Sequence, residues 1–266
     1  MDFLQILALA VVQGITEFLP ISSSGHLILA PHLFGFDDQG LNLDVAVHLG
    51  SLIAVVAYFR RDIVSILNGW TRSLLPGGQA NEESRLGWAI IVGVIPVVVA
   101  GLLLKSIVET EFRSAALIAT TTIGFGLLLG WVDLRARRNR DTADIGLLDA
   151  LLIGLSQVLA LIPGTSRSGI TITTGLMLGL TREAASRFSF LLSIPTILGS
   201  SLLVSMDLLQ AGQPADWGSL GMGVLMSALA AYLCIHLFLR FIEKIGMWPF
   251  VLYRVLLGLL IFALIW

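Results

Sequence analysis

Long apolar runs separated by short polar breaks dominate this chain. The first run, residues 1–19, ends at Pro20, and the next, residues 27–36, is too short for a bilayer that needs about 20 apolar residues. Two short helices joined by a polar elbow predict a re-entrant hairpin, because broken backbone at membrane depth is tolerated only inside protein or beside water. Full membrane spans are then predicted at residues 44–60, 86–104 and 114–132.

The same order of elements starts again in the second half. A broken pair at 147–180 is followed by runs at 188–206, 218–240 and 249–266. Three crossings in each half place the second half upside down relative to the first, which is the inverted-repeat architecture. We therefore predict an all-α integral membrane protein of one domain, with six transmembrane helices and two re-entrant hairpins, built from repeats over about 1–135 and 146–266.

The two broken pairs also match in sequence. The stretch QGITEFLPISSSGH (13–26) matches SQVLALIPGTSRSG (156–169) when Pro20 is laid on Pro163. In this register Arg167 is the one inserted residue. The repeat therefore contains most of the unusual chemistry of the chain.

Composition supports the membrane assignment. Hydrophobic residues make up 56% of the chain and charged residues only 13%, against about 25% charged in soluble domains. A net charge of −2 gives no reason to expect a nucleic-acid partner, and the single Cys234 excludes an internal disulfide. The N-terminal segment lacks the basic region and the cleavage site of a signal peptide, so we expect it to be mature structure.

Basic residues predict the orientation of the chain. If both termini lie outside, only Lys105 and Arg113 fall in outer loops, and Arg167 and Arg254 lie within membrane segments. The positive-inside rule favours this orientation. The remaining basic residues then lie inside: Arg60, Arg61, Arg72, Arg85, Arg135, Arg137, Arg138, Arg140, Arg182, Arg187, Arg240 and Lys244.

Glu17 is the first candidate functional residue. It follows Gln13 by four residues, so a helix places both side chains on one face of an otherwise apolar stretch. A carboxylate at membrane depth is costly and marks a functional site by default. The alternative is a glutamate near the interface that caps or pairs locally.

The hydroxyl residues of the two elbows are candidates for phosphate binding. A helix start offers free backbone N–H groups and a positive dipole end, which bind phosphate, and Arg167 can grip phosphate oxygens in a bidentate manner. Capping alone would explain the serines, but a buried Arg167 needs an anionic partner, either Glu17 or a ligand. The hydroxyl candidates are Ser22, Ser23, Ser24, Thr165, Ser166 and Ser168.

His26 follows Ser23 by three residues on the same helical face, which is the spacing of a nucleophile and its base. The alternative is a histidine that packs or forms a local hydrogen bond.

The other ionisable residues favour structural roles. Asp44 and His48 are four apart and predict a local hydrogen-bonded pair, and Arg254 is expected to snorkel to the inner surface or to pair. His32 is expected at the interface and His236 in packing.

The stretches QGITEFLPISSSGHL and LIPGTSRSGITI resemble the two signatures of the undecaprenyl-diphosphate phosphatase family linked to bacitracin resistance in bacteria. The resemblance covers essentially the whole chain. It implies hydrolysis of undecaprenyl diphosphate to the monophosphate carrier lipid and inorganic phosphate, which recycles the lipid for cell-wall synthesis. It also implies a bacterial plasma (inner) membrane location, a site facing the periplasm and a polyprenyl diphosphate as the partner, with no nucleic acid; a homodimer is left open.

The resemblance also implies roles for residues. The family's acidic motif falls on Gln13 and Glu17, its nucleophilic hydroxyl on Ser23, its histidine on His26 and its phosphate-binding arginine on Arg167. Since this chain has one carboxylate in that motif, substrate oxygens would have to complete a Mg²⁺ or Ca²⁺ shell begun by Glu17 and Gln13.

Two mechanisms and one rival function stay open at this point. Ser23 could attack the terminal phosphorus after losing its proton to His26 or Glu17, or Glu17 could activate water directly. Inverted repeats with broken helices are also a transporter architecture. A flippase for the lipid phosphate is therefore the rival or additional function.

Overall fold

A computed structural model describes the chain except residues 1–2, 24, 27–39, 112–113, 212–215 and 266. The described residues form helices, two of them short 3₁₀ turns, and the all-α prediction is confirmed. The helices are α1 (Phe3–Thr16), α3 (Gly40–Tyr58), α4 (Arg60–Ser73), α5 (Glu82–Glu111), α6 (Ala115–Arg135), η1 (Thr142–Asp144), α7 (Leu147–Val158), η2 (Leu159–Leu161), α8 (Arg167–Met177), α9 (Arg182–Ala211), α10 (Trp217–Ile245) and α11 (Trp248–Ile265).

Helix length and apolarity support a multi-pass membrane protein. Four described helices, α5, α6, α9 and α10, are long and apolar enough to cross a bilayer, and the bent pair α3–α4 would be a fifth span. The sixth predicted span, 249–266, corresponds to α11, whose 18 residues rise only about 27 Å. The predicted span 44–60 ends where the chain bends by 73° into α4, an amphipathic helix that begins with two arginines.

The helices pair reciprocally between the two halves of the chain. Helix α1 packs on α10 of the second half, and α7 of the second half packs on α5 of the first. Helices α3 and α9 pack together, as do α6 and α11. A two-fold relation between inverted halves would give this exchange, but the inverted repeat itself stays a prediction.

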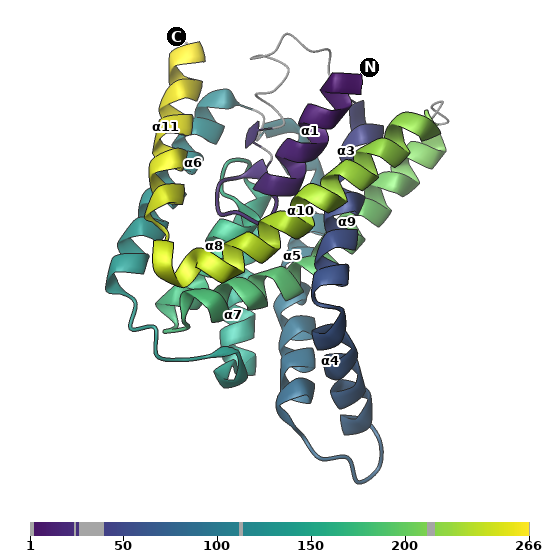
Figure 1. Ribbon diagram of the computed structural model, residues 1–266, viewed down its shortest axis with the longest axis vertical. Coiled ribbons are helices and arrows are strands. Elements are labelled where there is room, and N and C mark those ends of the chain that lie inside the picture. The colour runs from purple at the N-terminus through teal and green to yellow at the C-terminus, as the bar shows by residue number, and fades with distance from the viewer. Residues whose placement is uncertain (1–2, 24, 27–39, 112–113, 212–215, 266) are drawn as a thin grey trace.

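Small residues allow close approach at the centre of the bundle. A Cβ atom on Gly50 of α3 would lie 2.4 Å from the Val224 carbonyl oxygen of α10, and one on Gly14 of α1 would lie 2.6 Å from the Ser227 carbonyl oxygen. Membrane helices associate through such backbone contacts. Helix α10 runs obliquely across the molecule, and the visible ends of α1 and α11 lie at the end opposite the α4–α5 hairpin (Figure 1).

Two hairpins position the site. In the second, α7 and η2 lead to an elbow at 162–166 and back through α8; in the first, α1 leads to an elbow at 17–22, after which Ser23 begins a helical turn. The second arm of the first hairpin, predicted at 27–36, and His32 lie outside the described residues. Both elbows lie near the middle of the molecule (Figure 1).

Candidate active site

The two elbows share one cap geometry. Ser22 and Ser166 both adopt left-handed backbone conformations, with φ of 74° and 70°. The Gly25 N–H donates to Ser22 Oγ at 3.4 Å, and the Gly169 N–H donates to Ser166 Oγ at 3.1 Å. Each serine therefore caps the half-helix that follows it.

This geometry corrects the register of the repeat. With Ser22 laid on Ser166, Arg167 corresponds to Ser23, so Arg167 is not the inserted residue. The extra residue falls between Pro163 and Ser166 instead. The first register aligned Pro20 with Pro163. The prolines lie at different distances from the left-handed serine in the two elbows, so aligning them shifts the caps by one residue. The first position after the cap therefore carries a hydroxyl in one half and a guanidinium in the other.

A polar cavity of about 250 Å³ lies between the elbows and helices α3 and α9. Its lining is mostly hydroxyl and charged groups, in contrast to the apolar surface around it. The lining residues are Thr16, Glu17, Ser22, Ser23, His48, Ala160, Ser166, Arg167, Thr196, Ile197 and Ser200.

Glu17 is the centre of this cavity and is only 8% exposed. Arg167 donates from Nη2 to Glu17 Oε1 at 3.1 Å. Ser23 Oγ and Gln13 Nε2 donate to Glu17 Oε2 at 2.9 and 3.0 Å. A buried carboxylate is tolerable only when it is paired and hydrogen-bonded, and these three donors meet that need.

Arg167 begins α8 and reaches across the molecule to the first elbow. Its Nη1 donates to the Ser189 carbonyl oxygen of α9 at 3.1 Å, which holds the guanidinium against α9. Of the two anionic partners that the sequence allowed for Arg167, the structure shows Glu17. The pair joins the two hairpins through opposite charges.

The other predicted hydroxyls divide into two groups. Ser22, Ser23 and Ser166 line the cavity. Ser168 instead donates to the Leu19 carbonyl oxygen at 2.8 Å and ties α8 to the first elbow. Thr165 is fully buried and does not line the cavity, and Ser24 lies outside the described residues.

The structure does not bring His26 to Ser23. The His26 Nδ1–H donates to the Ser22 carbonyl oxygen at 2.7 Å, and Nε2 lies 2.5 Å from the Tyr253 hydroxyl. The two rings are nearly parallel, with centroids 5.5 Å apart. His26 therefore lines an apolar pocket on the side of Tyr253, and the acceptor within reach of the Ser23 hydroxyl is Glu17.

The predicted local hydrogen bond between His48 and Asp44 is confirmed, but the sequence reasoning missed that His48 lies at the site. Its Nδ1–H donates to the backbone carbonyl oxygen of Asp44 at 2.7 Å, which orients Nε2 to within 3.9 Å of Glu17 Oε2. Only the i,i+4 spacing with Asp44 pointed to this histidine. Thr196 and Ser200 of α9 also line the cavity. They are four residues apart and so lie on one helix face, but no signal in the sequence directs that face to the site.

Of the two roles expected for Arg254, snorkelling is wrong. Its side chain does not reach the inner surface but is fully buried, and its nitrogens donate to backbone carbonyl oxygens of α6 and of both elbows. Snorkelling requires a free path to the interface, and the elbows and α6 close that path.

Known proteins resemble this chain over nearly its whole length. The model of the family described as bacitracin resistance protein BacA matches residues 6–260. An undecaprenyl-diphosphatase of Hahella chejuensis is 57% identical, over 97% of this chain and 96% of its own. Undecaprenyl-diphosphatase 2 of Stutzerimonas stutzeri is 55% identical over 99% and 98%, and an undecaprenyl-diphosphatase of Chromohalobacter salexigens is 55% identical over 100% and 99%.

Proposed function

We propose that this chain, which belongs to the bacitracin resistance protein BacA family, hydrolyses undecaprenyl diphosphate to undecaprenyl phosphate and inorganic phosphate in the cavity around Glu17. It is a membrane hydrolase of the undecaprenyl-diphosphatase kind, and it recycles the carrier lipid. One observation supports the location of the site above all others. A buried carboxylate receives a hydroxyl proton donor on one oxygen and an arginine on the other.

The contact between Ser23 and Glu17 supports a covalent route. Glu17 takes the Ser23 proton while Ser23 Oγ bonds to the terminal phosphorus, and the bond from that phosphorus to the bridging oxygen breaks. Undecaprenyl phosphate leaves as an anion, and water then hydrolyses the phosphoserine to release inorganic phosphate. This is nucleophilic catalysis with an adjacent general base, and the 2.9 Å Oγ–Oε2 distance is within the range that such a base needs.

The rival route has Glu17 activate water while Ser23 only positions the phosphate. Trapping phosphate on a Ser23 peptide by rapid quench, beside a Ser23→Ala control, separates the two. A labelled Ser23 peptide supports the covalent route. Wild-type turnover of Ser23→Ala would leave direct attack by water as the mechanism.

Arg167 and the start of α8 provide positive potential for the diphosphate. Phosphoryl transfer depends mostly on positioning and electrostatic stabilisation. Arg167 is bound to Glu17 before substrate arrives, so a phosphate oxygen that takes over Nη2 leaves Glu17 freer to accept the Ser23 proton. Substrate binding would then activate the base.

A divalent cation, Mg²⁺ or Ca²⁺, fits this site only together with the substrate. Among the described residues no cluster of three or more His, Cys, Asp or Glu side chains could hold a metal. Gln13 Oε1 is buried, and no described residue donates a hydrogen bond to it; the Gln13 amide is bonded to the Glu17 carboxylate. Glu17 and Gln13 would hold the ion and diphosphate oxygens would complete its shell; the cation would offset negative charge on the phosphates.

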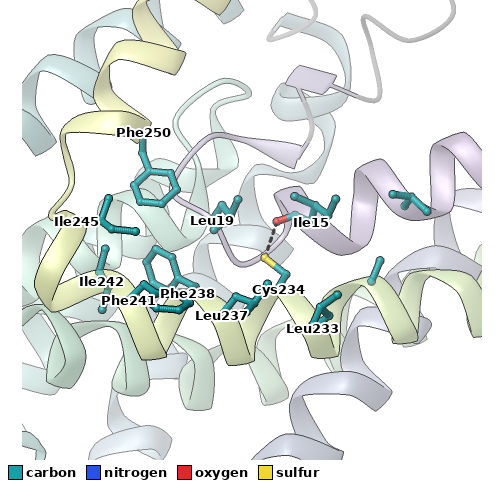
Figure 2. A pocket seen from close by; sticks show the side chains of 12 residues that line it. Ile15, Leu19, Leu233, Cys234, Leu237, Phe238, Phe241, Ile242, Ile245 and Phe250 are labelled. Carbon is teal, nitrogen blue, oxygen red and sulfur yellow. Dashed lines mark hydrogen bonds between the residues drawn. The ribbon is translucent and has the colours of Figure 1, made fainter.

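An apolar groove supports a place for the isoprenoid chain. Two pockets of about 470 and 420 Å³ share Val11, Ile15, Leu19 and Phe250, and the second also includes Thr16, which lines the polar cavity. Figure 2 shows side chains of α10 facing Ile15 and Leu19 across the first of these pockets. Because Thr16 lines both the second pocket and the polar cavity, the groove leads from the phosphate site to an apolar surface.

Chain-length dependence tests the groove. Leu233 lines it and is 57% exposed, whereas Leu229, one turn earlier on α10 and 58% exposed, does not. We expect Leu233→Trp to raise KM for a long-chain polyprenyl diphosphate and to leave KM for farnesyl diphosphate unchanged, with Leu229→Trp as the matched control. The groove would be rejected if Leu233→Trp and Leu229→Trp changed KM equally. It would also be rejected if Leu233→Trp changed KM equally for the long-chain substrate and for farnesyl diphosphate.

We also propose that both termini and the cavity mouth face the periplasm. The distribution of arginines supports this orientation, and the visible ends of α1 and α11 lie at the same end of the molecule (Figure 1). Labelling a cysteine introduced at Asp216 with an impermeant reagent in intact spheroplasts, using a Cys234→Ala background, would test it. Protection of that cysteine until the membrane is opened would reverse the orientation.

Phosphate release by the purified protein from a long-chain polyprenyl diphosphate tests the function itself. We expect release that is lost in Glu17→Ala and Arg167→Ala and reduced by a chelator. A wild-type protein that binds the lipid without releasing phosphate would favour the flippase instead.

A further inference from the structure

Arg254 of α11 joins the two elbows from the side away from the cavity. Its Nη1 donates to the Pro20 carbonyl oxygen of the first elbow at 3.3 Å. Its Nη2 donates to the carbonyl oxygens of Gly164 and Thr165 in the second elbow, both at 2.9 Å. One side chain therefore connects two backbone segments that are far apart in sequence.

Helix α6 completes the environment of this arginine. Arg254 Nε donates to the Thr122 carbonyl oxygen at 2.9 Å, and the Thr121 hydroxyl donates to the Pro163 carbonyl oxygen at 2.6 Å. The side chain of Arg254 is fully buried. In the described part of the chain it forms no ion pair with a carboxylate. Among the described residues, its charge is therefore solvated by carbonyl dipoles and meets no counter-charge.

This positive charge lies directly behind the first turn of α8. A Cβ atom on Gly169 would lie 2.8 Å from Arg254 Nη1 and 3.1 Å from Ser166 Oγ. Charge interactions are weakly screened where water is excluded. Arg254 thus adds to the positive potential that the helix start and Arg167 present to the cavity.

The hydrogen bonds of Arg254 also set the direction of a peptide group. A trans peptide points its C=O and N–H in opposite directions. Because the Thr165 carbonyl oxygen is held by Arg254, the N–H of Ser166 points away from Arg254, and Ser166 lines the cavity. Arg254 itself does not line it. Without this restraint, carbonyl oxygens of the elbow could turn toward the phosphates and repel them.

We propose that Arg254 is a positioning residue for phosphate binding: it holds the carbonyl oxygens of both elbows away from the cavity and places an unneutralised positive charge behind the phosphate site. This inference rests on the proposed location of the site around Glu17. It predicts that loss of Arg254 weakens the binding of phosphate groups, beyond any effect on folding.

The test compares Arg254→Met and Arg254→Lys with wild type in the full-length, detergent-solubilised protein. For Arg254→Met we expect KM for a long-chain polyprenyl diphosphate and the inhibition constant of inorganic phosphate to rise about tenfold or more, the scale on which loss of a supporting residue behind a site acts. Arg254→Lys keeps the charge with fewer donors, so it should recover part of the phosphate affinity. Arg182→Met is the control, because Arg182 is a largely buried arginine paired with Asp133 away from the cavity; it should lower the melting temperature and leave both constants unchanged.

A second variant covers the case in which Arg254→Met does not fold. A Cβ atom on Gly126 of α6 would lie 2.9 Å from Arg254 Cβ and 3.2 Å from Nε, so Gly126→Ala displaces the arginine without removing a charge. We expect it to raise both constants in the same direction. Wild-type constants in whichever of these variants folds would overturn the proposal.

Arg167→Ala, assayed in parallel, separates this proposal from the assignment of the site. If Arg167→Ala is inactive while the Arg254 variants bind phosphate normally, only the role of Arg254 is wrong. If Arg167→Ala turns over like wild type, the site itself is misplaced and the Arg254 proposal fails with it.

Discussion

Glu17 Oε1 accepts a hydrogen bond from Arg167 Nη2 at 3.1 Å, which joins two hairpins that lie in opposite halves of the sequence. The other oxygen of the same carboxylate accepts the Ser23 hydroxyl. One buried side chain therefore links the two hairpins and is placed to act as a base.

Glu17→Gln tests both roles. Glutamine still accepts a hydrogen bond from Arg167 but leaves the buried guanidinium without its counter-charge, and it cannot take the Ser23 proton at neutral pH. We expect the melting temperature to fall, and kcat of the folded protein to fall by about 10²–10⁴, the usual contribution of a general base. Thermal melting and phosphate release on one preparation measure both, and an active Glu17→Gln would exclude Glu17 as the base.

His26 is the other candidate base, and its geometry predicts a smaller effect. Its Nδ1–H donates to the Ser22 carbonyl oxygen and its Nε2 faces Tyr253, so it cannot receive the Ser23 proton in this arrangement. We expect His26→Asn, which can still donate to a carbonyl oxygen, to lose less kcat than Glu17→Gln. A steady-state comparison of kcat decides between them, and a larger loss in the His26 variant would restore the Ser23–His26 pair.

The cap of α8 can be tested by two substitutions at one position. Ser166 combines a side-chain cap with a positive φ of 70°, so alanine removes the hydrogen bond and keeps the strain, whereas glycine removes both. Loss of an N-cap hydroxyl to alanine costs about 1 kcal/mol and to glycine only a few tenths. Melting temperatures should therefore rank wild type, Ser166→Gly, Ser166→Ala in descending order. The reverse order of the two variants would argue against strain at this serine.

The ion pair between Arg140 and Asp149, in the first turn of α7, is expected to make a pH-dependent contribution to stability. Burial alone would raise the pKa of the Asp149 carboxyl, but hydrogen bonds from Arg140 and the Gly146 N–H, with the Arg140 charge, lower this pKa below its ordinary value. A carboxyl whose pKa is lower in the folded state stabilises the protein above its unfolded pKa of about 3.9, and the contribution is lost as pH falls through the folded pKa.

The measurement for this pair is the difference in melting temperature between wild type and Asp149→Asn from pH 6 to pH 3. We expect a constant advantage for wild type at the upper end that shrinks below about pH 4. Glu82→Gln, at the exposed start of α5, controls for general acid effects. An advantage that stays constant at low pH would show that the charge of Asp149 contributes nothing.

Local sequence determined much of this protein. Pro20 and Pro163 break their apolar runs, and the serines beside them cap the helices that follow, because caps and breaks depend on residues within one turn. The contact between Glu17 and Arg167 is not local: the sequence offered it as one of two anionic partners that a buried Arg167 needs, and the structure shows it. Apolar length predicted α5, α6, α9 and α10 as spans, and the sixth span, at α11, stays a prediction.

The tertiary structure alone decided which distant side chains complete the site. His48 and Thr196 reach the cavity because α3 and α9 pack together, and no spacing within either helix specifies that contact. Arg254 became a buried link between the elbows because α6 and the two hairpins surround it, whereas its sequence neighbours suggested a path to the surface. The left-handed conformations of Ser22 and Ser166 define the register of the repeat. Serine rarely adopts a positive φ, so residue type alone does not reveal these positions. Sequence therefore specifies elements and caps through near neighbours, and the packing of distant helices selects which of their polar groups meet.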